Sequence, residues 1–148
     1  MKTTFSNPKW AEIPNIDLYL DQVLLYVNQV CGPISPGKDK GLTASMVNNY
    51  VKHGYLTKPD KKKYQRQQIA RLIAITTLKS VFSIQEIAQT LNSLQSQASS
   101  DQLYDAFVDY MNQGIDPANP IIQTSCQTVK LYHQTLALIH RTQEEVIQ

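Results

Sequence analysis

The chain has 148 residues, of which 42% are hydrophobic, which is enough apolar material for a real core and excludes global disorder. No run approaches 18 uninterrupted apolar residues, and the N-terminus lacks the apolar block of a secretory signal, so we expect no membrane span and no export. The two distant cysteines, Cys31 and Cys126, do not form a disulfide framework, which favours reduced thiols and a cytoplasmic location.

Charge is unevenly distributed, although the formal net charge is only +2. Between Lys38 and Lys79 there are ten Lys or Arg against two Asp, whereas the remainder holds four basic and ten acidic residues. A basic segment within an acidic body raises the potential that phosphate groups feel, which favours an anionic partner. A solvated lysine-rich loop is the alternative interpretation.

The N-terminal part predicts an irregular arm over 1–14 and then a helix that Asn15 caps and that runs to about Val30. Apolar residues recur along this helix at helical spacing. They are Ile16, Leu20, Val23, Val27 and Val30. The stretch 34–41 contains Pro36 and Gly37, which are typical of a loop.

A short helix over 43–52 follows, with Thr43 as its cap and Gly54 as the left-handed residue just beyond its end. The segment 57–64 is rich in lysine and turn-forming residues. Its Pro59-Asp60 pair favours a turn, so we expect a tight basic hairpin there.

Two further helices are predicted over 66–80 and from Ser83 to about Leu94. Gln65 caps the first, although glutamine is a weak capping residue. The second begins with a capping box, in which Ser83 and Glu86 satisfy each other's backbone N–H groups.

The segment 92–100 is rich in Ser and Gln and separates two halves of the chain. Ser99 and Gln102 repeat the capping-box pattern for a helix that Gly114 closes. Asn119 and Pro120 then begin a last helix that no breaker interrupts before residue 148.

The last helix is apolar on more than one side, because Leu131 and Leu138 lie largely outside the stripe that its other apolar residues form. That stripe consists of Ile122, Val129, Leu136 and Ile139. A helix of this kind is buried on several sides, so it is central to its own domain or it also pairs with a second copy of the chain.

The segment from 43 to 91 suits DNA, because a short helix fits a major groove about 12 Å wide. Asn48 and Asn49 carry the paired donors and acceptors that can read a base edge, and nearby lysines can bind phosphates. We expect packing from Tyr50, and from Tyr64 a packed ring with its hydroxyl near a phosphate. The candidate DNA-binding residues are Thr43, Ser45, Asn48, Asn49, Lys52, Lys58, Lys61, Lys62, Lys63, Tyr64 and Arg66.

The order of residues through this segment resembles the winged helix-turn-helix module of MerR-type regulators. The residues that carry the resemblance are Tyr50, Gly54, Tyr55-Leu56, Pro59, Tyr64, Ile69, Leu72, Ile75, Phe82-Ser83-Ile84 and Glu86-Ile87. The resemblance implies a recognition helix, a wing and two supporting helices. The family usually places Arg at Asn48, Glu at Val51, Arg at Lys62 and Gly at Val81, so its promoter-twisting behaviour is not carried over. The whole chain also resembles the bacterial domain-of-unknown-function family 1836, most clearly from about 13 to 94.

Other constellations give no site. Cys126, His133 and His140 recur every seven residues on one helix face, but successive members are about 10 Å apart, too far for one zinc ion. A shared metal site across a dimer and a partly buried helix face are the two interpretations, and the second is favoured. Asp101, Asp105 and Asp109 predict a solvated face. Without a phosphate loop, a Cys-x-x-Cys pair or a nucleophile elbow, we expect no enzyme, no metal and no cofactor.

The sequence therefore predicts a mainly α protein, with a winged helix-turn-helix over 13–94 and a C-terminal helical region over 99–148. The expected function is that of a DNA-binding transcriptional regulator that acts as a homodimer, with the helix 43–52 in the major groove and the wing 57–64 on phosphates. Two alternatives are a protein-interaction module without DNA binding and a small-molecule sensor with a pocket in the C-terminal helices. Nothing in the sequence indicates the operator or the effector.

Overall fold

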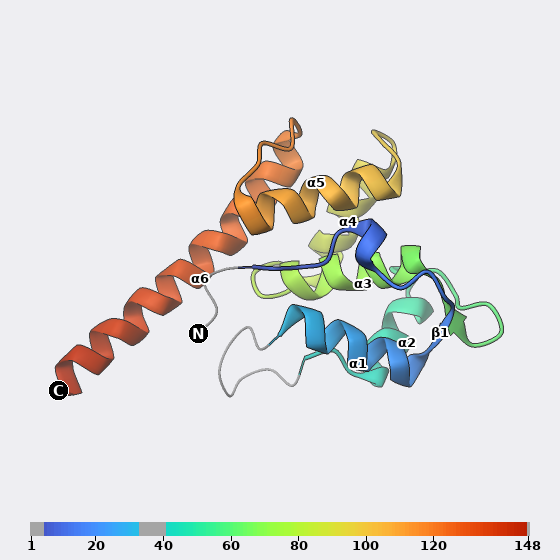
Figure 1. Cartoon of the computed structure of the whole chain (residues 1–148), viewed down its shortest axis with the longest axis horizontal. Helices are drawn as coiled ribbons and strands as arrows, with labels where there is room; N and C mark the ends of the chain where they lie inside the picture. Colours follow the sequence, from blue (N-terminus) through green and yellow to red (C-terminus); the bar gives the residue numbers. More distant parts are fainter. Residues whose placement is uncertain (1–4, 33–40, 148) are drawn as a thin grey trace.

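The computed structural model describes residues 5–32 and 41–147, and the described chain is mainly helical, as predicted (Figure 1). Its elements in chain order are η1 (Trp10–Glu12), β1 (Leu18–Tyr19), α1 (Leu20–Cys31), α2 (Ala44–Lys52), β2 (Lys63–Tyr64), α3 (Arg66–Leu78), α4 (Ile84–Gln95), α5 (Ser100–Gln113) and α6 (Pro120–Ile147). The predicted loop 34–41 lies almost wholly outside the described residues.

Helix α3 is the centre of the fold, and it contacts α1, α4, α5 and α6. Its buried residues occur on every side of the helix, which is typical of a core helix. They are Gln68, Ile69, Ala70, Leu72, Ile73, Ala74, Ile75, Thr77 and Leu78. One hydrophobic cluster extends from Phe5 to Val129 and so includes residues of both predicted regions.

Most predicted helix ends are confirmed, because they depend on short-range hydrogen bonds. The Thr43 hydroxyl accepts from the Met46 N–H at the start of α2. Ser83 and Glu86 form the reciprocal capping box of α4. The Asn119 side chain accepts from two N–H groups at the start of α6. Gly54, with φ +77°, is left-handed just after α2.

The predicted start of the first helix at Asn15 is wrong, because α1 begins at Leu20. The residues before it form β1, which pairs antiparallel with β2 so that Leu18 faces Tyr64. Tyr19 then caps the helix by donating its N–H to the Gln22 side chain. The predicted 66–80 helix likewise ends at Leu78, and Ser99 provides no side-chain cap for α5.

The N-terminal arm is anchored along α5, so the solvated face predicted for three aspartates is wrong for Asp105 and Asp109, whereas Asp101 is exposed as predicted. The Asp105 carboxylate accepts from the Trp10 N–H at 2.8 Å, and Asp109 forms an ion pair with Lys9 at 3.3 Å. Two hydrogen bonds between Asn7 and Asn112 extend the attachment. The acidic spacing on α5 therefore holds backbone and a lysine of the arm.

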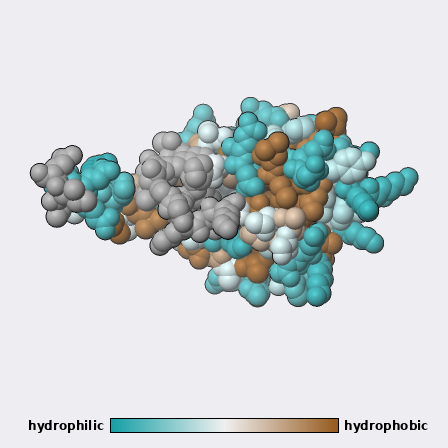
Figure 2. Space-filling view, turned by 90° about the horizontal axis from the view of Figure 1, so that it is seen from below, coloured by the Kyte–Doolittle hydropathy of each residue, from teal (hydrophilic) through white to brown (hydrophobic). Residues whose placement is uncertain are grey.

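Helix α6 has two different halves. In the first half Ile122, Cys126, Val129 and His133 are buried against the body. The second half extends away from the body (Figure 1), and Leu138 and Ile139 are exposed there. Figure 2 shows that the opposite end of the molecule is hydrophilic and carries protruding side chains.

Asn28 on α1 binds the backbone of the residue Leu42, which lies just before α2. Its carboxamide donates to the Leu42 carbonyl at 2.9 Å and accepts from the Leu42 N–H at 2.8 Å. Gly41 precedes this clamp with φ +75°, and a Cβ there would meet the Asn28 carboxamide. The clamp therefore sets where α2 begins relative to α1.

We predict that Asn28→Ala lowers the free energy of unfolding by about 1–3 kcal/mol, because two partly buried backbone groups lose their partner. Urea denaturation followed by circular dichroism measures the change. Gln29→Ala, at an exposed position of the same helix, is the control and should change stability by less than about 0.5 kcal/mol. Equal losses in the two variants would show that the clamp contributes nothing specific.

Candidate nucleic-acid interface

Helix α2 presents a polar face because its apolar residues are on the other side. Val47 and Tyr50 are buried, so the packing predicted for Tyr50 is confirmed. The side chains that remain exposed are Ser45, Asn48, Asn49 and Lys52. Thr43 is half-buried, and its hydroxyl is used by the cap. The sequence thus places two carboxamides and a lysine on one exposed helical surface.

The segment after α2 contains the predicted tight turn. Asp60 and Lys63 exchange backbone hydrogen bonds of 3.1 and 2.9 Å around Lys61 and Lys62. Both central lysines have positive φ, +51° and +68°. This is the geometry of a type I′ turn, in which Asn and Gly are the preferred central residues. The strand that follows pairs with β1, and only Asp60 of residues 57–60 bridges to it, so the turn is held by a distant part of the chain.

The structure brings α2 and the turn together. Asn48, Pro59, Lys62 and Tyr64 line one groove between them. The same Asn48 lines a second, shallower hollow with Ser45, Asn49 and Lys52. All of these residues except Pro59 were predicted as site residues from the sequence, and the two hollows adjoin at Asn48.

Three residues of the first groove were missed by the sequence analysis. Tyr19, Leu20 and Asp21 line it because β1 pairs with β2. This pairing joins segments more than 40 residues apart, and two-residue strands leave no periodic signal. Asp21 is a negative charge beside Lys62, so the groove itself is less positive than the lysine content suggests.

The exposed lysines of this surface have no acidic partner within the part of the chain that the structure describes. Lys52, Lys58, Lys61 and Lys62 are exposed, and the salt bridges among residues 5–32 and 41–147 lie elsewhere. Lys63 differs, because its ammonium lies 5.2 Å from the centre of the Tyr19 ring. The unpaired lysines remain available to an anionic partner.

Two of the proposed residues are used inside the protein. Tyr64 is only 3% exposed, and burial raises the pKa of its phenol. Arg66 donates its Nε–H to the Ile13 carbonyl at 3.1 Å. Both residues therefore hold the turn and the arm against α3, and Tyr64 has almost no surface to offer a ligand.

The helix face that carries Cys126, His133 and His140 is partly buried in the core and partly exposed to solvent. Cys126 and His133 are buried, and burial raises the pKa of the Cys126 thiol to about 12. His140 is exposed and lies 3.0 Å from Glu144. Within the described residues, no three His, Cys, Asp or Glu side chains gather as a metal site would require. None of the helices described there has the length and apolar character needed to cross a bilayer.

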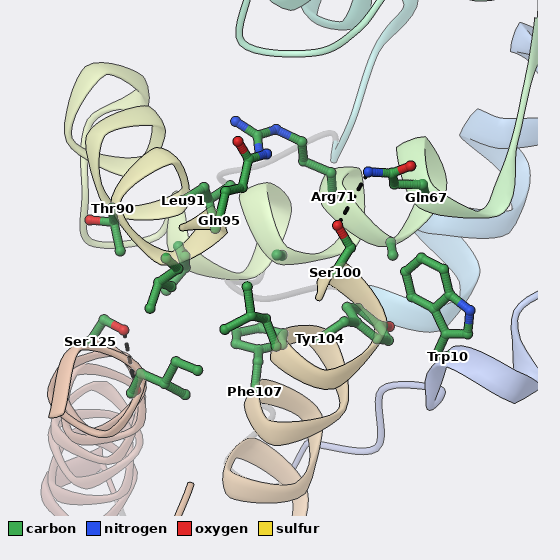
Figure 3. Close-up of a pocket in the computed structure, with 16 residues that line it drawn as sticks. Trp10, Gln67, Arg71, Thr90, Leu91, Gln95, Ser100, Tyr104, Phe107 and Ser125 are labelled. Atoms are coloured by element: carbon green, nitrogen blue, oxygen red, sulfur yellow. Dashed lines mark hydrogen bonds between the residues drawn. The ribbon is translucent and has the colours of Figure 1, made fainter. Parts of the chain in front are cut away.

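A cavity lies between α3, α4, α5 and the start of α6 (Figure 3). The pocket considered from the sequence lay within 100–148, whereas α3 and α4 provide half of this cavity's wall. Its volume is about 90 Å³, and its lining is predominantly apolar.

We predict that Lys61→Asn combined with Lys62→Gly raises the free energy of unfolding by about 1–2 kcal/mol, because left-handed backbone is costly for lysine. Urea denaturation measures this gain. Lys58→Asn removes a neighbouring exposed lysine outside the turn and should be nearly neutral. A loss of stability in the double variant would contradict the turn geometry.

Comparison with known sequences assigns this chain to a protein family. Residues 8–107 match the family described as domain of unknown function 1836, and this match contains α1 to α4 with the whole α2–turn surface. No curated protein and no solved structure gives a significant match. The match extends over more than half of the chain, and the protein therefore belongs to the domain of unknown function 1836 family.

Proposed function

We propose that this protein binds double-stranded DNA through the exposed face of α2 and the turn that follows it. The observation that carries the proposal is the pair Lys61 and Lys62, two unpaired lysines in left-handed backbone beside the carboxamide face of α2. A sequence under selection for stability alone favours Asn-Gly at these positions. Strained backbone of this kind is concentrated at functional sites, where its cost is offset by a ligand contact.

Helix α2 and the turn contribute different contacts to the proposed interface. Lysines at the turn act on phosphates, because their attraction is long-ranged and independent of base sequence. Asn48 and Asn49 lie on a helix of nine residues, and carboxamides can form paired hydrogen bonds with adenine in the major groove. Asp21 repels phosphate from the base of the groove, so the phosphate contacts belong to the exposed tip.

We infer a winged helix-turn-helix of the MerR-like kind as the architecture behind this contact. Support comes from the order of elements: α1 contacts α2, a basic turn follows, and α3 and α4 form the support. The wing strand β2 is fixed to the body through β1, which holds the turn in place. A rigid wing next to a short helix can contact the groove and its flanking backbone together.

The second half of α6 supports the proposal of a homodimer. Leu131 is 53% exposed, and Leu138 is 57% exposed one heptad later. Tyr132 and Ile139 repeat the same seven-residue spacing next to them. Such a double stripe suits helix pairing, and a two-fold dimer would present two α2 helices to two half-sites.

We predict that the Lys61→Asn, Lys62→Gly variant binds mixed-sequence duplex DNA more weakly and with a flatter salt dependence. Two lost phosphate contacts should reduce the slope of log K against log salt by about 1.8. Fluorescence anisotropy with a labelled duplex across a salt series measures both quantities. Asn-Gly is the preferred sequence for this turn, so the variant should stay folded. A loss of DNA binding would therefore come from the lost lysines and not from unfolding.

The control is Arg141→Gln, which removes a positive charge from an exposed position on the outer half of α6. It should leave the slope within error of the parent. An unchanged slope in the turn variant would show that Lys61 and Lys62 do not contact phosphates. Absence of binding by the parent even at low salt would contradict DNA binding and favour the alternative, an acidic protein partner for the same surface.

We predict that the parent is a dimer at tens of micromolar and that Leu131→Glu with Leu138→Glu makes it a monomer, because two exposed leucines leave an apolar helix interface. Light scattering after size exclusion gives the molar mass. Gln127→Glu with Gln134→Glu, at exposed polar positions of α6, adds the same charge and should preserve the dimer. A monomeric parent would contradict the proposed pairing.

A further inference from the structure

The cavity between α3, α4, α5 and α6 has an apolar interior and a polar rim. Figure 3 shows Tyr104 and Phe107 below the opening and Arg71, Gln67 and Gln95 above it. The apolar walls include Ala74, Leu91, Leu94, Phe107 and Ile122. Gln67 and Ser100 close one side of the rim with a hydrogen bond of 3.2 Å. The site is therefore a short apolar chamber with polar groups at its edge.

The volume limits what the chamber can hold. A space of about 90 Å³ is smaller than the cavity of about 150 Å³ that holds a benzene ring, so it accommodates an apolar group of about three or four carbon atoms. A nucleotide or a flavin is far larger than this. Because the interior is apolar, water gains few hydrogen bonds there and a hydrocarbon group is the better occupant.

Arg71 gives the rim a charge that the protein does not neutralise. Its Nε–H donates to the Tyr55 carbonyl at 2.7 Å, and its Nη2 donates to Asn92 Oδ1 at 3.3 Å. A guanidinium has five N–H donors, so three have no protein acceptor among residues 5–32 and 41–147. No carboxylate of those residues lies within salt-bridge distance of it.

The position of this guanidinium is fixed and partly shielded from water. Two neutral acceptors on different segments hold it, and burial lowers the pKa of Arg71. A partly buried cation without a counterion carries a desolvation cost that a bound anion would offset. Arginine also matches a carboxylate better than lysine does, because its planar donors bind both oxygens.

We propose that the cavity binds a small carboxylate with a short aliphatic body. The apolar body occupies the space between Leu94, Phe107 and Ile122, and the carboxylate binds the unused donors of Arg71. The inference does not rest on DNA binding, because the cavity lies away from the α2–turn surface, although Arg71 also donates to the Tyr55 carbonyl in the link between α2 and the turn.

Titration of the parent with butyrate tests the proposal, because its apolar body has about three carbon atoms. Trp10 lines the cavity and is the single tryptophan of the chain, so its fluorescence reports occupancy directly. Butyrate should saturate the signal and raise the melting temperature. The neutral amide of the same length, butyramide, should bind at least about tenfold more weakly. Benzoate, whose ring is too large for the space, should bind more weakly than butyrate.

Substitutions at two positions, Ala74 and Arg71, separate the parts of the site. Ala74→Leu fills the chamber from α3 and should abolish binding while the protein stays folded. Arg71→Lys keeps the charge but loses the planar fork, and Arg71→Gln loses both, so the preference for the acid should fall in that order. Arg141→Gln is the charge control and should bind as the parent does.

Several results would overturn the proposal. One is the absence of any fluorescence or melting response to butyrate up to about 10 mM. Another is equal affinity of acid and amide for the parent. A third is unchanged binding by a folded Ala74→Leu variant, which would place the acid outside the cavity.

Discussion

Two polar side chains of the central helix hold the link between α2 and the basic turn. The Gln68 carboxamide donates to the carbonyls of Thr57 and Lys58, and Arg71 donates to the carbonyl of Tyr55. Backbone carbonyls in such a link need partners wherever they are shielded from water. Because α3 is buried on every side, these partners are rigid, and the proposed interface takes its geometry from the core of the protein.

Local chemistry made much of this fold predictable. Thr43, Ser83 and Asn119 cap their helices as their sequence positions indicate, and a cap depends on residues two or three positions away. Long-range contacts were not predictable in the same way. The pairing of β1 with β2 moved the start of α1 from Asn15 to Leu20, since a segment cannot begin a helix while it pairs as a strand.

In the candidate site, too, the local features were predictable from the sequence and the long-range contacts were not. The sequence indicated which side chains of α2 and the turn are polar, and the structure places Asn48 next to Lys62. It could not indicate that Tyr64 is buried or that Asp21 enters the groove, because both result from the distant strand pairing. Asp105 and Asp109 of α5 were misread for a similar reason, since the arm that covers them comes from the other end of the chain.

The family match covers the α2–turn surface but not helix α6. It ends at residue 107, within α5, so the α2–turn surface lies inside the match and α6 lies beyond it. DNA contact through α2 would then be a property that the family can share. Helix α6, with its exposed leucines and its share of the cavity wall, lies outside the matched range.

The most direct test of the α2–turn surface as a DNA interface is a map of backbone amide resonances during titration with a short mixed-sequence duplex at low salt. The account predicts that the largest shifts fall on Asn48, Asn49, Lys61 and Lys62, with small shifts along the second half of α6. Shifts that cluster on α5 or α6 instead, or the absence of shifts at any residue, would contradict it.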